Sequence, residues 1–212
     1  GGWAPLVVLM GDHVSALPEE SMRESGVDFV ITGGDYDFVL LNLCEYLDGR
    51  TGAERLEGGI WRRDKGEIKH TGGYKLNHDI DGLPFIDRDL TRWTLYSEKN
   101  GNYKYLPGTY TMAARDCWWG RCSFCSWTTL YPGADYRAIK PERMADEVGI
   151  LVENYGVKEI MDDSGTFPAG EWLREFCSLM VKRGHNRRVK LDCNMRFGSL
   201  NEKDYKMMAE AG

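Results

Sequence analysis

Three cysteines within nine residues are the part of this sequence best suited to chemistry. Cys117, Cys122 and Cys125 follow the spacing C-x4-C-x2-C, and no fourth cysteine lies nearby. Soft sulfur ligands select iron–sulfur clusters, zinc or Cu(I). A structural zinc site normally closes with four protein ligands. A cubane held by three thiolates instead leaves one iron open to a group that is not protein. We therefore interpret the segment as a [4Fe–4S] cluster site with one open iron.

The alternative for the same residues is a zinc knuckle, or three ordinary thiols. A zinc knuckle needs a fourth ligand from a distant part of the chain, for which His70, His78 and Cys193 are available. None of these three has a ligand-like spacing.

The residues before the cysteines predict a parallel sheet with glycine-rich loops. Residues 6–10 and 27–32 are apolar runs typical of buried parallel strands. Gly11 and Ser15 fall in the expected loop after the first strand, and Gly33 and Gly34 end the second strand. Glycine lets the backbone approach a bulky ligand closely, although glycines also end strands in any α/β domain. A helix with Val39, Leu43 and Leu47 on its inner face is expected to follow.

The rest of the chain divides into a linker and a second α/β region. Residues 58–108 have little periodicity, apart from a β-hairpin expected from residues 60–63 and 67–70. From residue 110 a strand, a loop and a helix follow one another three times. Pro141 is placed for the first turn of a helix. This alternation predicts an α/β fold.

Several of these features together resemble the cobalamin-binding radical S-adenosylmethionine (SAM) proteins. They are the cysteine spacing, the aromatic residue Phe124 before the last cysteine, and the strand-like lead-in at residues 109–114. Residues 6–20 and 27–41 resemble the last two strand–loop–helix units of a cobalamin-binding domain, and residues 79–90 resemble the linker that follows it. The resemblance covers nearly the whole chain. The chain departs from the family in having four residues, rather than three, between the first two cysteines, which is tolerable if Gly120 supplies a turn.

The resemblance implies a fold class and three cofactors. The fold is the C-terminal part of a doubly wound cobalamin-binding domain (1–50), then a linker (51–108), then the first half of a partial (β/α)6 radical SAM barrel (109–212). The cofactors are a [4Fe–4S] cluster, SAM and cobalamin. The chain opens without methionine and stops after a helix, so we expect an internal fragment that is inactive alone.

The resemblance also implies residues that hold the cofactors. Phe124 is expected beside the SAM adenine, Asp163 as an acceptor for the SAM amino group, and Asn194 and Arg196 near the SAM carboxylate. The family often places a Gly-Gly-Glu motif after the second strand, and this chain has Asp162-Asp163-Ser164-Gly165 there. A turn or helix cap is the alternative for Asp163, and a surface ion pair for Arg196. Gly11, Ser15, Gly33 and Gly34 are expected to approach cobalamin.

Composition limits the remaining function classes. The net charge of -6 gives no general attraction to nucleic acid, and no apolar run reaches the roughly 20 residues of a membrane span. We expect no signal peptide. The clustered and scattered cysteines favour a reducing cytoplasm over disulfides. The expected partners are a substrate of unknown identity and an electron donor such as flavodoxin or ferredoxin.

The sequence therefore predicts a radical SAM enzyme that cleaves SAM reductively. With cobalamin it would carry out methyl transfer or another radical transformation, as members of this family do. Two alternatives stay open. One is a radical SAM enzyme whose remnant cobalamin domain no longer binds the cofactor, and the other is a non-catalytic module with a structural zinc.

Overall fold

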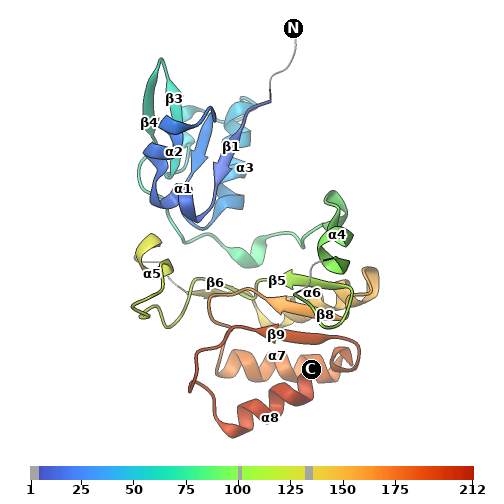
Figure 1. Cartoon of the computed structure of the whole chain (residues 1–212). Coiled ribbons are helices and arrows are strands. Elements are labelled where there is room, and N and C mark those ends of the chain that lie inside the picture. Colours follow the sequence, from blue (N-terminus) through green and yellow to red (C-terminus); the bar gives the residue numbers. More distant parts are fainter. Residues whose placement is uncertain (1–4, 100–101, 132–135) are drawn as a thin grey trace. The chain divides into compact units, whose positions relative to one another are not determined.

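The computed structural model describes residues 5–99, 102–131 and 136–212. It divides into two compact units (Figure 1). The first unit contains residues 1–78 and 121–135, and the second contains residues 79–120 and 136–212. Because residues 121–135 belong to the first unit, that unit is built from two separate stretches of chain.

The first unit is built on a four-stranded sheet of order β1-β2-β3-β4. β1 and β2 are parallel, whereas β2–β3 and β3–β4 are antiparallel. The bounds are Val8–Met10, Phe29–Ile31, Ile60–Asp64 and Glu67–His70. The predicted strands and the predicted hairpin are present. However, β3 pairs with β2, so this part of the segment expected as a linker continues the N-terminal sheet.

The helices of the first unit are mostly short. They are α1 (Asp12–Ala16), α2 (Pro18–Glu24), α3 (Tyr36–Leu47) and α5 (Trp127–Leu130), with a 3₁₀ turn at Ala53–Arg55. The loop expected at residues 11–15 is therefore wrong, because residues 12–16 are helical. Gly11 turns the chain out of β1 with φ 129°, and the Ser15 amide donates to the Gly11 carbonyl at 3.0 Å to close the first helical turn. A helix of five residues is too short to show an apolar period.

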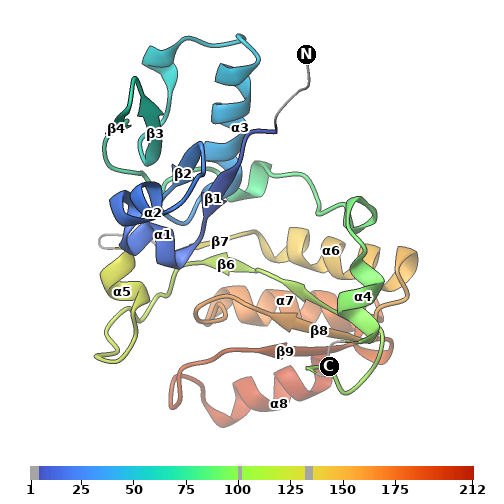
Figure 2. The ribbon, with the colours of Figure 1, turned by 45° about the horizontal axis from the view of Figure 1, so that its top comes forward.

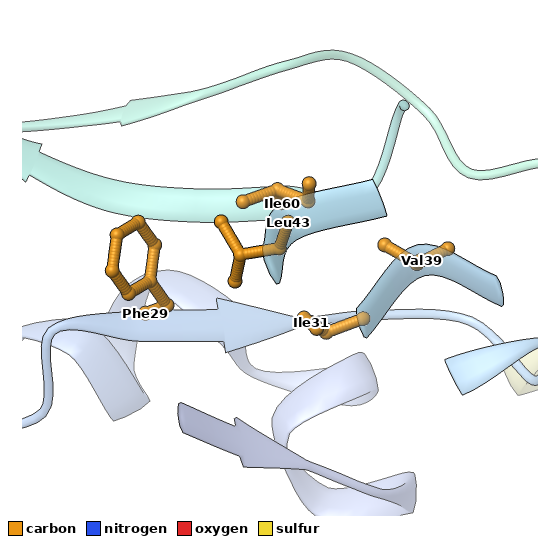
Figure 3. Packing of buried hydrophobic residues seen from close by; sticks show 5 residues of the cluster. All are labelled: Phe29, Ile31, Val39, Leu43 and Ile60. Carbon is orange, nitrogen blue, oxygen red and sulfur yellow. The ribbon is translucent and has the colours of Figure 1, made fainter. Parts of the chain in front are cut away.

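Alternating side chains of β2 fill two hydrophobic cores, one on each face of this sheet. Phe29 and Ile31 pack with Val39, Leu43 and Ile60 on the side of α3 (Figure 3). On the other face, Val30 packs with buried residues from α1, α2 and the segment just before β2: Val14, Met22 and Val27. Successive side chains of β2 therefore point to opposite faces, as expected for a strand that is covered on both sides.

The second unit contains a parallel sheet of order β5-β8-β9, with bounds Gly108–Thr111, Glu159–Asp162 and Lys190–Cys193. Each strand leads to one of three neighbouring helices, α6 (Pro141–Asn154), α7 (Glu171–Lys182) and α8 (Glu202–Ala211) (Figure 2). The three predicted strand–loop–helix repeats are thus present. A short antiparallel pair, β6 (Ala114–Arg115) and β7 (Arg137–Ala138), follows β5. The remaining elements are α4 (Trp93–Glu98) and 3₁₀ turns at Ile80–Gly82, Arg88–Leu90 and His185–Arg187.

A buried arginine fixes the segment before β5 to the second unit. Arg88 donates to the Thr109 hydroxyl at 3.1 Å and to the Tyr110 carbonyl at 2.8 Å. Its guanidinium lies 3.5 Å from the buried carboxylate of Glu147 on α6. Burial raises the pKa of Glu147, and the charge of Arg88 only partly opposes this. Arg88 therefore holds β5 and α6 from within the core.

No helix among the residues that the structure describes is both long enough and apolar enough to span a bilayer.

Candidate cofactor sites

The first cysteine is held by the segment that follows β8. The sulfur of Cys117 lies 3.1 Å from the hydroxyl of Thr166, which itself donates to the Gly165 carbonyl at 2.8 Å. The neighbouring Trp118 donates its indole N–H to the Phe167 carbonyl at 3.2 Å. Gly120 has φ 55°, so it supplies the turn that the four-residue spacing requires. The half-buried Cys117 thiol is therefore placed at the carboxyl end of the parallel sheet.

The other two cysteines fold with the first unit. Cys122 and Cys125 form a tight turn in which the Cys125 amide donates to the Cys122 carbonyl at 3.1 Å. Both side chains are half-buried, whereas Phe124 between them is 90% exposed. Its predicted place beside the SAM adenine stays a prediction.

All six cysteines are reduced, and the assignment of three of them to one cluster stays a prediction. None of the six cysteines, all of which lie in described parts of the chain, is joined in a disulfide. Over residues 5–99, 102–131 and 136–212, no three His, Cys, Asp or Glu side chains are grouped as metal ligands. The ligand set Cys117, Cys122 and Cys125 fits a cluster by its chemistry, because it offers three thiols and no harder donor.

The residues considered as a fourth zinc ligand have other roles in the structure. His78 places Nδ1 at 2.8 Å from Asp35 and Nε2 at 2.8 Å from Glu57, so both ring nitrogens have carboxylate partners. His70 stacks on Trp61. Burial raises the pKa of the Cys193 thiol to about 12, which opposes the thiolate that a metal needs.

Two adjacent carboxylates at the end of β8 have different surroundings. Asp162 is fully buried and accepts from the Ala113 amide at 2.6 Å, the Thr111 hydroxyl at 3.2 Å and the Ser164 amide at 3.1 Å. Burial raises the pKa of Asp162, while these hydrogen bonds oppose the rise. The side chain of Asp163 is exposed at the same strand end. Asp162 therefore organises the loops, and Asp163 is accessible to a ligand.

At the end of β9, the structure places the predicted arginine against the cysteine loop. The Arg196 guanidinium lies 3.6 Å from the ring centre of Trp119, a cation–π contact that holds it at this strand end. Asn194 is exposed, and its carbonyl accepts from the Phe167 amide at 2.8 Å. Asp163, Asn194 and Arg196 thus follow neighbouring parallel strands at the same edge of the sheet.

In the first unit, one serine joins the predicted glycine loops. The Ser15 hydroxyl donates to the Gly11 carbonyl at 2.8 Å and accepts from the Gly33 amide at 3.1 Å. A Cβ added at Gly11 would meet nothing within 4 Å. At Gly33, whose φ is 95°, an added Cβ would lie 2.7 Å from the Tyr74 ring, so that glycine is covered by Tyr74. Of the three glycines predicted here, Gly11 has the most open surroundings.

Sequence reasoning missed three residues beside these loops. Tyr131 donates from its hydroxyl to Asp12 at 2.5 Å and lies 3.2 Å from the hydroxyl of Tyr36. Tyr36 in turn lies 3.1 Å from the Ser15 hydroxyl. No local signal points to this network, because Tyr131 and Asp12 are 119 residues apart in sequence.

Comparison with proteins of known sequence places the chain among larger relatives. The chain matches no protein-family model. It is 29% identical over 97% of its length to an uncharacterized methyltransferase of Pyrococcus horikoshii, and it covers 43% of that protein. It is 32% identical over 90% of its length to the anaerobic magnesium-protoporphyrin IX monomethyl ester cyclase of Cereibacter sphaeroides, covering 31% of it. The chain therefore spans less than half the length of these relatives.

Comparison with solved structures identifies the fold. The radical SAM methyltransferase TsrM of Kitasatospora setae, solved with cobalamin and a [4Fe–4S] cluster, matches 98% of the chain with a TM-score of 0.70. A second structure of the same enzyme, with tryptophan substrate and a SAM analog, matches with a TM-score of 0.69. The chain covers 40% of either structure at 16% identity, so the likeness concerns the fold alone.

Proposed function

Because this chain belongs to the family of cobalamin-binding radical SAM proteins, we propose that it is part of a radical SAM enzyme. The enzyme uses a [4Fe–4S] cluster to cleave SAM reductively, with cobalamin as a second cofactor. The observation that carries the proposal is the cysteine segment, whose first thiol stands at the carboxyl end of a parallel sheet. Ligands bind at that end of the strands in parallel α/β folds.

Cys117, Cys122 and Cys125 would hold the cluster. When bound, a cluster with three thiolate ligands supplies an open iron for the amino and carboxylate groups of SAM and a low-potential electron. The Thr166 hydroxyl gives its one proton to the Gly165 carbonyl, so it accepts from the Cys117 thiol. Once that sulfur is a thiolate, Thr166 would have to turn its proton from Gly165 to the sulfur to donate a hydrogen bond to it. Hydrogen bonds to such sulfurs tune the potential of the bound metal.

Three residues at the strand ends would hold SAM. The exposed Asp163 carboxylate suits a cationic amino group, and the Arg196 guanidinium suits a carboxylate, which it can bind through two N–H groups. The stack on Trp119 already holds the Arg196 side chain in place, so less side-chain freedom is lost on binding. Asn194 adds an amide on the same edge.

Gly11, Ser15, Gly33 and Gly34 would approach cobalamin. Gly11 supports this role, since no atom lies within 4 Å of the position its Cβ would take. At Gly33 the ligand would have to displace or contact the Tyr74 ring. Ser15 keeps the two loops together through its bonds to Gly11 and Gly33.

The reaction we propose is methyl transfer or another radical transformation. The two outcomes correspond to the names of the relatives, one a methyltransferase and one a cyclase. We further propose a cytoplasmic location and an electron donor of the flavodoxin or ferredoxin kind.

Iron and sulfide analysis of the anaerobically reconstituted full-length protein tests the cluster. We expect about four irons and four sulfides per chain and an electron paramagnetic resonance signal after reduction. Zinc without sulfide would favour the structural zinc module instead.

Substitution of one ligand gives the sharper test. Cys122→Ala should abolish formation of 5′-deoxyadenosine from SAM and lower the iron content. Cys44→Ala, an exposed cysteine on α3, is the matched control and should keep both. Continued 5′-deoxyadenosine formation by Cys122→Ala would contradict the ligand assignment. Retention of a corrinoid absorbance band after addition of hydroxocobalamin separately tests the cobalamin claim.

A further inference from the structure

Four polar side chains close a ring of contacts in the first unit. Tyr131 donates to Asp12 at 2.5 Å, Tyr36 lies 3.2 Å from Tyr131, and Ser15 lies 3.1 Å from Tyr36. Asp12 and Ser15 share helix α1, which closes the ring. The Ser15 proton is given to the Gly11 carbonyl and the Tyr131 proton to Asp12, so Tyr36 donates its one proton to either hydroxyl neighbour.

The ring joins two stretches of chain that are distant in sequence. Asp12 and Ser15 follow β1, whereas Tyr131 follows α5, six residues after Cys125. Tyr131 is 8% exposed, and its ring meets those of Tyr74 and Trp127 edge-on at 6.3 Å. Burial, together with the bond to Asp12, raises the pKa of Tyr131, so its hydroxyl keeps the proton that it donates.

Ser15 connects the ring to both glycine loops. Its hydroxyl bonds the Gly11 carbonyl and the Gly33 amide, so a displacement of α1 moves the groups of both loops. At the other end, Tyr131 anchors the segment that contains Cys122 and Cys125. Tyr131, Tyr36 and Ser15 therefore connect the segment that contains the third cysteine to the Gly33 amide.

We propose that Tyr131 is a positioning residue that couples the glycine loops after β1 and β2 to the segment carrying Cys122 and Cys125. The proposal rests on the proposed function, because coupling matters chemically only if cobalamin and the cluster occupy these two places. When a cofactor orders the glycine loops, the cysteine segment should lose less conformational entropy on binding its own cofactor, and the reverse should also hold. Binding of the two cofactors should be mutually favourable.

Hydrogen exchange of the full chain without cofactors tests the coupling directly. Tyr131→Phe keeps the ring and removes the hydroxyl. We expect amide exchange to become roughly tenfold faster at residues 11–17 and at residues 125–131, which is the factor for losing one hydrogen bond to a charged acceptor. Exchange in the β3–β4 hairpin should not change, which shows that the variant is folded.

Tyr74→Phe is the matched control. The Tyr74 hydroxyl donates to the Leu130 carbonyl and so anchors the same segment without joining the ring. Its loss should speed exchange at residues 125–131 alone. Asp12→Asn, a second variant that keeps the side-chain oxygen and removes the charge, should affect both regions as Tyr131→Phe does, but less. Faster exchange at residues 125–131 alone in Tyr131→Phe would overturn the proposal.

A binding measurement separates this proposal from the proposed function. Hydroxocobalamin is titrated into the full-length wild-type protein with and without the reconstituted cluster, and binding is followed by corrinoid absorbance. We expect several-fold tighter binding with the cluster, and a ratio near one in Tyr131→Phe. A ratio that Tyr131→Phe leaves unchanged would refute the coupling. No binding in the wild type, combined with the expected exchange pattern, would refute the cobalamin role and leave the positioning role of Tyr131 standing.

Discussion

At the residue scale, the neighbouring carboxylates Asp162 and Asp163 have different roles. Asp162 holds the surrounding loops, and Asp163 is accessible to a ligand. The sequence identified both as candidates at a strand end, and favoured Asp163 for binding. The structure gives Asp162 three hydrogen-bond donors from the loops after β5 and β8 and leaves the Asp163 side chain exposed. Asp162 is the last residue of β8, whereas Asp163 lies just beyond the strand in the loop that follows it.

Glu147 gives a prediction on pH. Its pKa is raised in the folded protein above the ordinary value of 4.5, chiefly by burial. A carboxyl group of this kind contributes stability that is fully present below pH 4.5 and is lost as pH rises through the folded pKa. Relative to the variant Glu147→Gln, the wild type should therefore lose free energy of unfolding as pH rises above 4.5 and through the raised pKa of Glu147.

Urea unfolding at a series of pH values measures this difference. Both proteins change with pH through their other groups, so only the difference between them is interpreted. A wild type that becomes more stable relative to Glu147→Gln as pH rises would show that the 3.5 Å contact with Arg88 outweighs the cost of burial.

The sequence could identify the cysteines, the strand-end polar residues and the glycine loops because each is a local pattern. It could not identify the partners of those residues. Thr166 reaches Cys117 from 49 positions away, and Tyr131 reaches Asp12 from 119 positions away. Contacts of this range depend on the packing of whole elements, which no window of sequence contains.

At the element scale, helix α3 contains two leucines, Leu43 and Leu47, whose different burial can be compared directly. Val39, Leu43 and Leu47 were predicted as one inner stripe. Val39 and Leu43 are buried in the core beside β2 (Figure 3). Leu47 at the last turn is 42% exposed, so that part of the prediction is wrong. In the last turn of the helix, Tyr46 rather than Leu47 packs against this core.

We expect Leu43→Ala to lower the free energy of unfolding by ~3 kcal/mol, because it leaves a cavity among Phe29, Ile31 and Ile60. Leu47→Ala should cost only about 0.5 kcal/mol. Denaturant unfolding of both variants measures the contrast. Equal losses would mean that Leu47 is covered in solution.

Other elements show where local patterns stop being informative. The α/β alternation, the hairpin and the Pro141 start of α6 were predictable because each has its own period or turn residue. The pairing of β3 with β2 was not, since neither strand specifies its neighbour. Arg88 falls in the segment 79–90 that resembles a linker, yet it is buried through contacts with Thr109 and Tyr110.

At the scale of the whole molecule, each of the two units has a core of its own. The first centres on the residues around Leu43, and the second contains fully buried side chains of α6, β8 and α7 such as Met144, Ile160 and Leu173. This division predicts that a cavity in one core is felt mainly within its own unit.

Hydrogen exchange can check that division. Leu43→Ala should speed amide exchange in β2 and β3 by about a hundredfold, the factor for ~3 kcal/mol, and leave β8 and β9 nearly unchanged. Met144→Ala should have the reverse effect. Acceleration of all these strands by either variant would indicate that the chain unfolds as a single cooperative body.

The first unit includes residues 121–135, so it cannot be completed until the ribosome has also made residues 79–120 of the second unit. Asp12 leaves the exit tunnel 119 residues ahead of its partner Tyr131. At translation rates of about 5–20 residues per second, that delay is roughly 6–24 s. During this interval α1 lacks its contacts with α5 and Tyr131, so we expect the loops after β1 and β2 to reach their final arrangement only after the segment that follows the third cysteine has emerged.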